Sequence, residues 1–131
     1  MQMPDTDFQG VVAIFGSRKI DKDFAYKILS AEMKADFEYI TSGNIDGVAR
    51  IAIQVAGEKG LKITLYNYES GLGWYMALKD ITSKNRKMVE ACTSAIVVWD
   101  GESKGTKREI EMLNKRGKLY TLYSTNFDVL I

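Results

Sequence analysis

Five short apolar runs alternate with four segments of helical periodicity along this chain. The apolar runs are Val11–Phe15, Tyr39–Thr41, Leu61–Tyr66, Ala95–Trp99 and Leu119–Tyr123. Between them, apolar residues recur at helical spacing within Lys22–Lys34, Gly47–Lys59, Asp80–Thr93 and Lys104–Arg116. Runs as continuously apolar as Val11–Phe15 are typical of parallel strands that are covered on both faces. The alternation therefore predicts an α/β fold, a Rossmann-like doubly wound parallel five-stranded sheet in three αβα layers.

The length and the start of the chain bear on its domain count and its location. Its 131 residues suit one domain over 1–131, because domains most often have roughly 100–150 residues. No apolar run is long enough for a membrane span, and Met1–Asp5 lacks the basic start and apolar stretch of a signal peptide. We therefore expect a cytoplasmic protein that makes no membrane contact.

Histidine and cysteine usage excludes several kinds of chemistry. The chain has no His, and Cys92 is its one Cys. It therefore has no Ser-His-Asp or Cys-His nucleophile system, no His-ligated metal, no internal disulfide and no Cys-rich zinc site. We expect neither a metal nor a cofactor.

Lys and Arg total 18 against 17 for Asp and Glu, and this balance argues against nucleic acid as a partner.

The first predicted strand runs directly into Gly16, Ser17 and Arg18. Glycine lets a ligand approach the backbone, a hydroxyl can bond phosphate or ribose, and a guanidinium can hold an anion through two hydrogen bonds. Doubly wound sheets bind ligands outside the carboxyl ends of their strands, where this loop is expected. An ordinary turn followed by a solvated arginine explains the tripeptide equally well.

The second predicted strand ends in a loop of small and polar residues that opens a helix. Its candidate ligand-binding residues are Ser42, Gly43, Asn44 and Gly47, and its expected helix N-cap is Asn44 or Asp46. Exposed amides at such a helix start can hold a phosphate. A capped turn whose glycines serve its backbone geometry is the alternative.

The loop after the fourth predicted strand carries the strongest signal for a phosphate-binding loop. Glycines, hydroxyls and a lysine at a helix N-terminus form a cradle of backbone N–H groups aided by the helix dipole. This is not a Walker loop, because Lys104 precedes the second glycine. As the third such loop at one sheet edge, it favours a ligand site over a simple capped loop. Its candidate binding residues are Asp100, Gly101, Ser103, Gly105 and Thr106.

Glu109 has two competing interpretations. It follows Thr106 by three residues, so its carboxylate can face back toward the loop and bind a ribose hydroxyl or act in N-glycosidic chemistry. The neighbouring Lys107, Arg108 and Glu111 instead favour a solvated, ion-paired helix face. The residues alone favour neither.

The segment 66–76 combines four aromatic residues with two glycines. A nucleotide base could stack there under a mobile lid. Packing of the aromatic residues on the core or on a second subunit is the more common use of such a segment. On the helix that follows, Lys84 and Met88 are expected to share a face, because they are four residues apart.

Taken in order, these motifs resemble the SLOG superfamily, and within it the small stand-alone proteins that start with Gly-Ser-Arg. The superfamily includes the LONELY GUY phosphoribohydrolases, the DNA-processing protein DprA and ligand-sensing domains of bacterial conflict systems. The resemblance spans nearly the whole chain and implies a nucleotide-binding Rossmann-like domain with Asn85 in its site. The matching motifs are Gly16-Ser17-Arg18, Ser42-Gly43-x-x-x-Gly47-Val48, Asn85-x-x-Met88 and Trp99-Asp100-Gly101-x-Ser103-x-Gly105-Thr106.

The phosphoribohydrolases bind phosphate with a Pro-Gly-Gly-x-Gly-Thr-x-x-Glu loop, whose Glu is catalytic, and complete the site with an Arg on the preceding helix. Gly105, Thr106 and Glu109 match that loop, so the resemblance implies catalytic roles for Glu109 and Lys84 if the protein is an enzyme. Lys84 stands where the Arg would be, and Asp100–Ser103 replaces the Pro-Gly-Gly part. Lysine cannot reproduce a bidentate guanidinium fork, so binding survives these departures better than catalysis does.

We therefore predict a module that binds a nucleotide or a nucleotide-derived ligand, phosphorylated or ADP-ribose-like, for sensing or sequestration. The alternative is an enzyme that cleaves an N-glycosidic bond, as a nucleotide phosphoribohydrolase or a nucleoside deoxyribosyltransferase does. Binding of single-stranded DNA, by analogy with DprA, conflicts with the balanced charge. By analogy with the dimeric phosphoribohydrolases, we also expect a homodimer or a higher homo-oligomer.

Overall fold

The computed structural model describes residues 10–43, 45–67 and 74–125, with the side chains of 74–81 left out. Strands and helices alternate throughout. The strands are β1 (Val11–Gly16), β2 (Glu38–Ser42), β3 (Ile63–Tyr66), β4 (Ser94–Trp99) and β5 (Leu119–Ser124). The helices are α1 (Lys22–Glu32), α2 (Val48–Lys59), α3 (Trp74–Ala91) and α4 (Lys104–Lys115). Every element expected from the periodicity is present, and most bounds agree to within two residues.

All five strands are parallel and form one sheet in the order β3-β2-β1-β4-β5. The chain winds outward from β1 through β2 to β3, then returns to place β4 on the other side of β1. Strand order therefore reverses between β1 and β4, whose register pairs Gly16 with Val98 at their carboxyl ends. This is the position at which doubly wound sheets form a ligand crevice.

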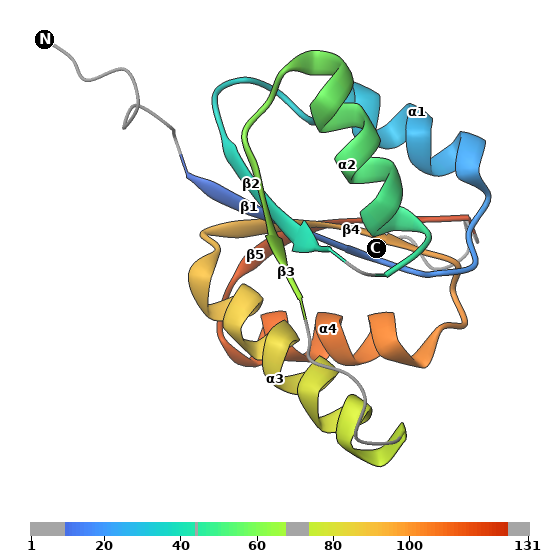
Figure 1. Cartoon of the computed structure of the whole chain (residues 1–131), viewed down its shortest axis with the longest axis vertical. Helices are drawn as coiled ribbons and strands as arrows, with labels where there is room; N and C mark the ends of the chain where they lie inside the picture. The colour runs from blue at the N-terminus through green and yellow to red at the C-terminus, as the bar shows by residue number, and fades with distance from the viewer. Residues whose placement is uncertain (1–9, 44, 68–73, 126–131) are drawn as a thin grey trace, which may run out of the picture.

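Two helices cover each face of the sheet, with α1 and α2 on one side and α3 and α4 on the other (Figure 1). The predicted Rossmann-like, three-layer αβα fold is confirmed. One core cluster joins α1 and α2 to the sheet around Leu29 and Val55, and a second joins α3 and α4 to it around Met88 and Leu113. None of the described helices is long and apolar enough to cross a membrane.

Helix starts show where local sequence rules hold and where packing overrides them. Asp21 caps α1, since its Oδ1 accepts from the amides of Asp23 (2.9 Å) and Phe24 (3.2 Å). The expected cap of α2 by Asp46 is wrong: Gly47 is the N-cap, and Asp46 pairs instead with Arg50 (2.9 Å). Asn44, the alternative cap, lies outside the described residues.

Helix α3 begins at Trp74, six residues before the expected start at Asp80. The aromatic and glycine-rich composition of this stretch favoured a loop, but the helix includes Trp74, Tyr75 and Met76. Aromatic residues are only weakly unfavourable in helices, so tertiary context readily overrides that preference. The helix therefore starts closer to β3 than the sequence indicated.

Candidate functional site

Ser17 joins the two halves of the sheet at the switch point between β1 and β4. Its side chain is 1% exposed, and its Oγ accepts a hydrogen bond from the Asp100 amide (3.0 Å). The same oxygen lies 3.4 Å from the hydroxyl of Thr106 on α4. The Ser17 amide donates to the Val98 carbonyl (3.1 Å). The Ser17 and Thr106 hydroxyls, which the sequence predicts to bind ligand, thus connect the loops after β1 and β4 inside the molecule.

Asp100 shapes the loop between β4 and α4. Its Oδ1 accepts from the amides of Glu102 (2.9 Å) and Ser103 (2.7 Å), which closes a tight turn. Burial opposes ionisation of this carboxyl, but the two amide bonds and the Ser17 hydroxyl outweigh it and lower the Asp100 pKa. Gly101 adopts a φ of 85°, a conformation that favours glycine. Asp100 and Gly101 therefore determine where α4 begins.

The N-terminus of α4 opens at this loop without a side-chain cap. Ser103 is its N-cap residue, yet the Ser103 side chain makes no capping hydrogen bond. The first intrahelical bond runs from the Lys107 amide to the Ser103 carbonyl (3.2 Å), so the amides of Lys104, Gly105 and Thr106 precede it. A Cβ added at Gly105 would meet no atom within 4 Å. The arrangement offers backbone donors and open space for an anionic group.

The β2 loop approaches the β1 loop so closely that only glycines fit between them. Gly47 has a φ of 87°, and a Cβ there would overlap the Ser17 carbonyl and the Arg18 backbone. A Cβ on Gly16 would likewise overlap the Val48 side chain. The Val48 amide donates to the Ser17 carbonyl (3.1 Å) and locks the contact. Arg18 itself is exposed, so its guanidinium is available at the rim.

Gly43 has a similar structural role at the end of β2. Its amide donates to the Tyr66 carbonyl (2.9 Å), and a Cβ there would overlap the Asn67 side chain. The glycine therefore lets the ends of β2 and β3 pack together, and ligand binding is not needed to explain it.

A buried polar cluster lies below the loops, between the end of β2 and helices α3 and α4. Lys84 is 4% exposed, and its Nζ donates to the Ser42 Oγ (2.8 Å). Asn85, 6% exposed, donates from Nδ2 to the Glu109 Oε2 (3.0 Å). Met88 completes the cluster, because its sulfur lies 3.9 Å from the Ser42 Oγ. The shared face expected for Lys84 and Met88 is confirmed.

Two oxygens of this cluster are buried without a hydrogen-bond partner among the described residues, namely Asn85 Oδ1 and Glu109 Oε1. Burial raises the pKa of Glu109 to about 8, although Lys84 and the Asn85 hydrogen bond act in the opposite direction. Burial likewise lowers the pKa of Lys84 to about 8, which Glu109 opposes and Arg18 supports. An unpaired buried oxygen is costly, so each of these two atoms needs a partner that the described residues do not supply.

No protein-family model matches this chain, and no curated protein matches it. Among solved structures, it is similar to the C-terminal domain of a hydrogenase from Pyrococcus furiosus. The two share 13% sequence identity over 89% of this chain and 93% of that chain, with a TM-score of 0.45. At that distance the likeness says nothing about function, which has to come from the site's own residues.

The structure brings most of the predicted site residues to the carboxyl edge of the sheet, in two connected groups. The upper group consists of the β1, β2 and β4 loops and the start of α4, and the lower group is the Lys84 cluster. Glu109 connects them, since it follows Thr106 by one turn of α4 and reaches Asn85 on α3. A solvated position for Glu109 is therefore wrong. The aromatic segment at 68–73 and Asn44 lie outside the described residues.

Trp99 has a structural role in the site that the sequence motif did not predict. Trp99 ends β4, and its Nε1 donates to the Ser103 carbonyl (3.1 Å), which clamps the two ends of the phosphate-binding loop candidate. The signal was present in the motif, because an indole at the end of an otherwise aliphatic strand requires a partner for its N–H.

Proposed function

We propose that this chain is a SLOG-type nucleotide-binding module, which recognises a nucleotide or a nucleotide-derived ligand for sensing or sequestration. One observation carries the proposal: Asn85 Oδ1 and Glu109 Oε1 are buried with no partner in the part of the chain that the structure describes, and Glu109 lies one turn beyond Thr106 at the uncapped start of α4. One small molecule could satisfy both, with a group rich in hydrogen-bond donors at the two oxygens and an anionic group at the start of α4. Phosphorylated and ADP-ribose-like nucleotides carry both groups.

The anionic end of such a ligand would bind at the start of α4. Backbone amides at a helix N-terminus and the helix dipole together favour a phosphate. The open space at Gly105 lets the phosphate approach these amides. The exposed Arg18 guanidinium can add two parallel, charge-assisted hydrogen bonds at the rim of the site. Lys84 lies deeper and adds positive potential.

The donor-rich end would reach the lower cluster. A ribose hydroxyl can donate to Asn85 Oδ1, and another can accept from Glu109 Oε1 when that carboxyl is protonated or donate to it when it is ionised. Each bond would remove the cost of a buried unpaired polar atom. Asn85 is held in place by its bond to Glu109, so its free oxygen has a defined direction. The proposal also includes a cytoplasmic location and a homo-oligomeric state.

A second candidate is an enzyme that cleaves an N-glycosidic bond, of the phosphoribohydrolase or deoxyribosyltransferase-like type. The raised pKa of Glu109, about 8, favours it, because the carboxyl is then largely protonated at neutral pH. A protonated carboxyl can donate its proton to a departing base as a general acid. Lys84 would then hold the phosphate of the ligand, and a water molecule would attack the sugar carbon as the protonated base leaves.

One experiment separates the two candidates. The purified chain is incubated with AMP, ADP-ribose, NAD, cyclic nucleotides and deoxynucleosides, while the melting temperature and the release of free base are followed. A binding module should show a higher melting temperature with at least one phosphorylated nucleotide and no free base. Base release that Glu109→Gln abolishes would support the enzyme. No response to any of these ligands would contradict both.

Arg18→Ala tests the site with whichever nucleotide responds. Loss of the guanidinium should weaken binding by about tenfold, which is about 1.4 kcal/mol. Lys19→Ala is the matched control, because Lys19 is the exposed neighbour of Arg18 and its replacement by alanine also removes one positive charge. Equal affinity in the two variants would sink the assignment of the phosphate end.

A further inference from the structure

A groove runs between α3 and α4 on the side of these helices that faces away from the sheet. The residues that line the groove recur at helical spacing, with Thr82 and Arg86 one turn apart on α3. Helix α4 and its C-cap contribute residues at intervals of three and four, which are Arg108, Glu111, Met112, Lys115 and Arg116. The hollow measures about 320 Å³. It is thus a continuous surface built by both helices, apart from the candidate nucleotide site.

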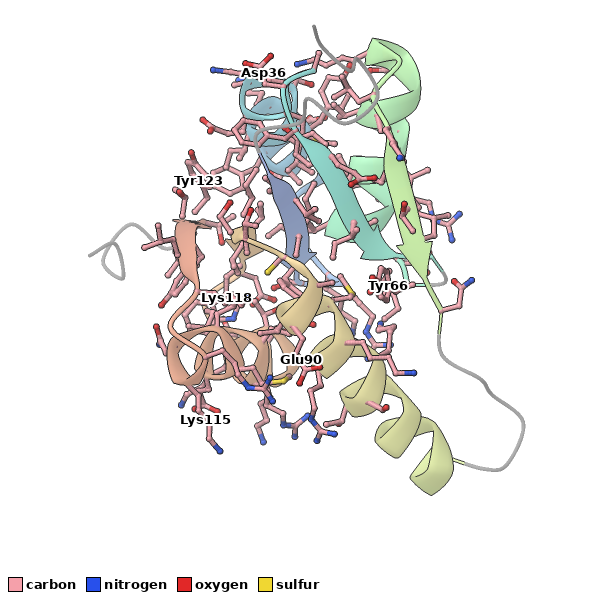
Figure 2. The ribbon with its side chains drawn as sticks, turned by 90° about the vertical axis from the view of Figure 1, so that its left-hand side faces the viewer. Asp36, Tyr66, Glu90, Lys115, Lys118 and Tyr123 are labelled. Carbon is pink, nitrogen blue, oxygen red and sulfur yellow. The ribbon has the colours of Figure 1, made fainter. Side chains whose placement is uncertain are left out.

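The groove is strongly basic even though the chain as a whole is nearly neutral. The stretch 82–118 carries nine Lys and Arg against five Asp and Glu, whereas the rest of the chain has more acidic than basic residues. Figure 2 shows Lys115 on α4 and Glu90 on α3, with side-chain nitrogens gathered between and below them. The balanced total therefore conceals an uneven distribution in space.

The positive charges of this groove are only partly compensated within the molecule, since Glu90 interacts electrostatically with both Arg116 and Arg86. Arg116 pairs with Glu90 (2.6 Å). No described residue forms an ion pair with Arg86, Arg108 or Lys115, and Glu111 is the one acidic residue of the lining. Like charges that converge on one hollow repel each other and raise the local positive potential. The groove thus complements a ligand that brings several negative charges.

We infer that the groove between α3 and α4 is a docking surface for an acidic segment of a partner protein, anchored by an apolar side chain on Met112. The arginines present planar forks that match carboxylates, and the half-buried Met112 offers an adaptable apolar floor between them. This combination of an apolar centre with a charged rim is typical of protein interfaces.

A nucleic acid fits the same surface less well. A phosphate backbone needs a track of positive charge along its length, whereas this groove is short and places Glu111 among its cations. The apolar floor at Met112 also has no counterpart on a sugar–phosphate backbone. A segment that places glutamates around a leucine satisfies both features.

The test measures fluorescence anisotropy of three labelled probes on the full chain at low and high salt. The probes are a short peptide with glutamates flanking a pair of leucines, an all-glutamate peptide of equal length, and single-stranded oligo-dT. The double variant Arg86→Glu/Arg108→Glu should weaken binding of the leucine-containing peptide at least about tenfold. Lys22→Glu/Lys27→Glu on α1 is the control, because it changes the net charge equally at exposed positions elsewhere and should stay within about twofold.

Met112→Gln separates a true docking groove from general charge attraction. It keeps the side-chain length but removes the apolar floor, so it should weaken the leucine-containing peptide and leave the all-glutamate peptide unchanged. The inference is overturned if the two peptides bind equally to the wild type, if both double variants lose affinity alike, or if oligo-dT binds most tightly. Circular dichroism melts of each variant show whether it is folded under the assay conditions.

Discussion

At the scale of single residues, Lys84 and Glu109 are the chain's most consequential pair. Both have ionisable groups held between α3 and α4, and burial drives each toward its neutral form. Neither charge helps the fold as much as an apolar side chain of the same size would, which makes the pair a candidate for the proposed site.

The pair predicts an unusual dependence of stability on pH. Glu109 keeps its proton in the folded chain between pH 4.5 and about 8, whereas the unfolded chain loses it, so the free energy of unfolding falls as pH rises through this range. Lys84 has lost its proton in the folded chain between about 8 and 10.5, whereas the unfolded chain keeps it, so stability recovers there. A minimum near pH 8 is expected.

Urea unfolding across a pH series measures this minimum. Each group contributes a slope of at most about 1.4 kcal/mol per pH unit. Glu109→Gln should flatten the fall below pH 8, while Glu111→Gln, an exposed change on the same helix, should leave the profile as it is. An unchanged slope in Glu109→Gln would show that its carboxyl is solvated.

At the scale of elements, the glycines of the strand-end loops have different purposes. Gly47 is required by the fold, because its φ of 87° and its contact with the Ser17 and Arg18 backbone leave no room for a side chain. Gly105 has open space around it and an ordinary helical position, so the fold does not require glycine there. The proposed function gives this glycine a purpose, because open space at an uncapped helix start lets a phosphate approach the backbone amides.

Alanine at these two positions should act in opposite directions. Gly47→Ala should lower the free energy of unfolding by about 2 kcal/mol, because it adds both strain and overlap. Gly105→Ala should raise it by about 0.5 kcal/mol through helix propensity, yet weaken nucleotide binding by filling the space at the amides. Thermal melts with and without the responding nucleotide measure both quantities. If Gly105→Ala binds as tightly as the wild type, the phosphate does not lie at this helix start.

At the scale of the whole molecule, the helices cover the sheet unevenly. Helix α2 packs over β1 and β2 with α1 beside it, whereas α4 packs over β1, β4 and β5 on the opposite face. On the α1 side, a hollow of about 260 Å³ opens where β4 and β5 begin, lined in part by Phe37, Ile96 and Leu119. Leu119 is 77% exposed at the start of the edge strand. The described residues thus leave an apolar corner of the sheet open.

This uneven coverage predicts which leucines matter to stability. Leu119→Lys should change the free energy of unfolding by less than about 0.5 kcal/mol, because the side chain is already in water. Leu113→Ala should cost about 2–5 kcal/mol, because Leu113 is fully buried in the core between α4 and the sheet. Urea unfolding of the two variants checks this contrast. A loss above about 1 kcal/mol in Leu119→Lys would mean that this corner is covered in solution.

The fold itself was largely predictable from the sequence, because its signals are local. A run such as Val11–Phe15 has to be covered on both faces, and the alternation with helical segments leaves a parallel sheet as the natural arrangement. Helix α3 was the exception, since its aromatic first residues favoured a loop and yet the helix begins at Trp74.

The site divides along the same line. The sequence by itself determined which residues stand at strand ends, because a β-α alternation places every strand-end loop at one edge of a parallel sheet. Only the tertiary structure decided what each residue does there. Ser17 and Thr106 face each other inside the molecule, and Glu109 turns inward to Asn85. Burial and partners depend on residues far apart in the chain, and no local pattern of residues encodes them.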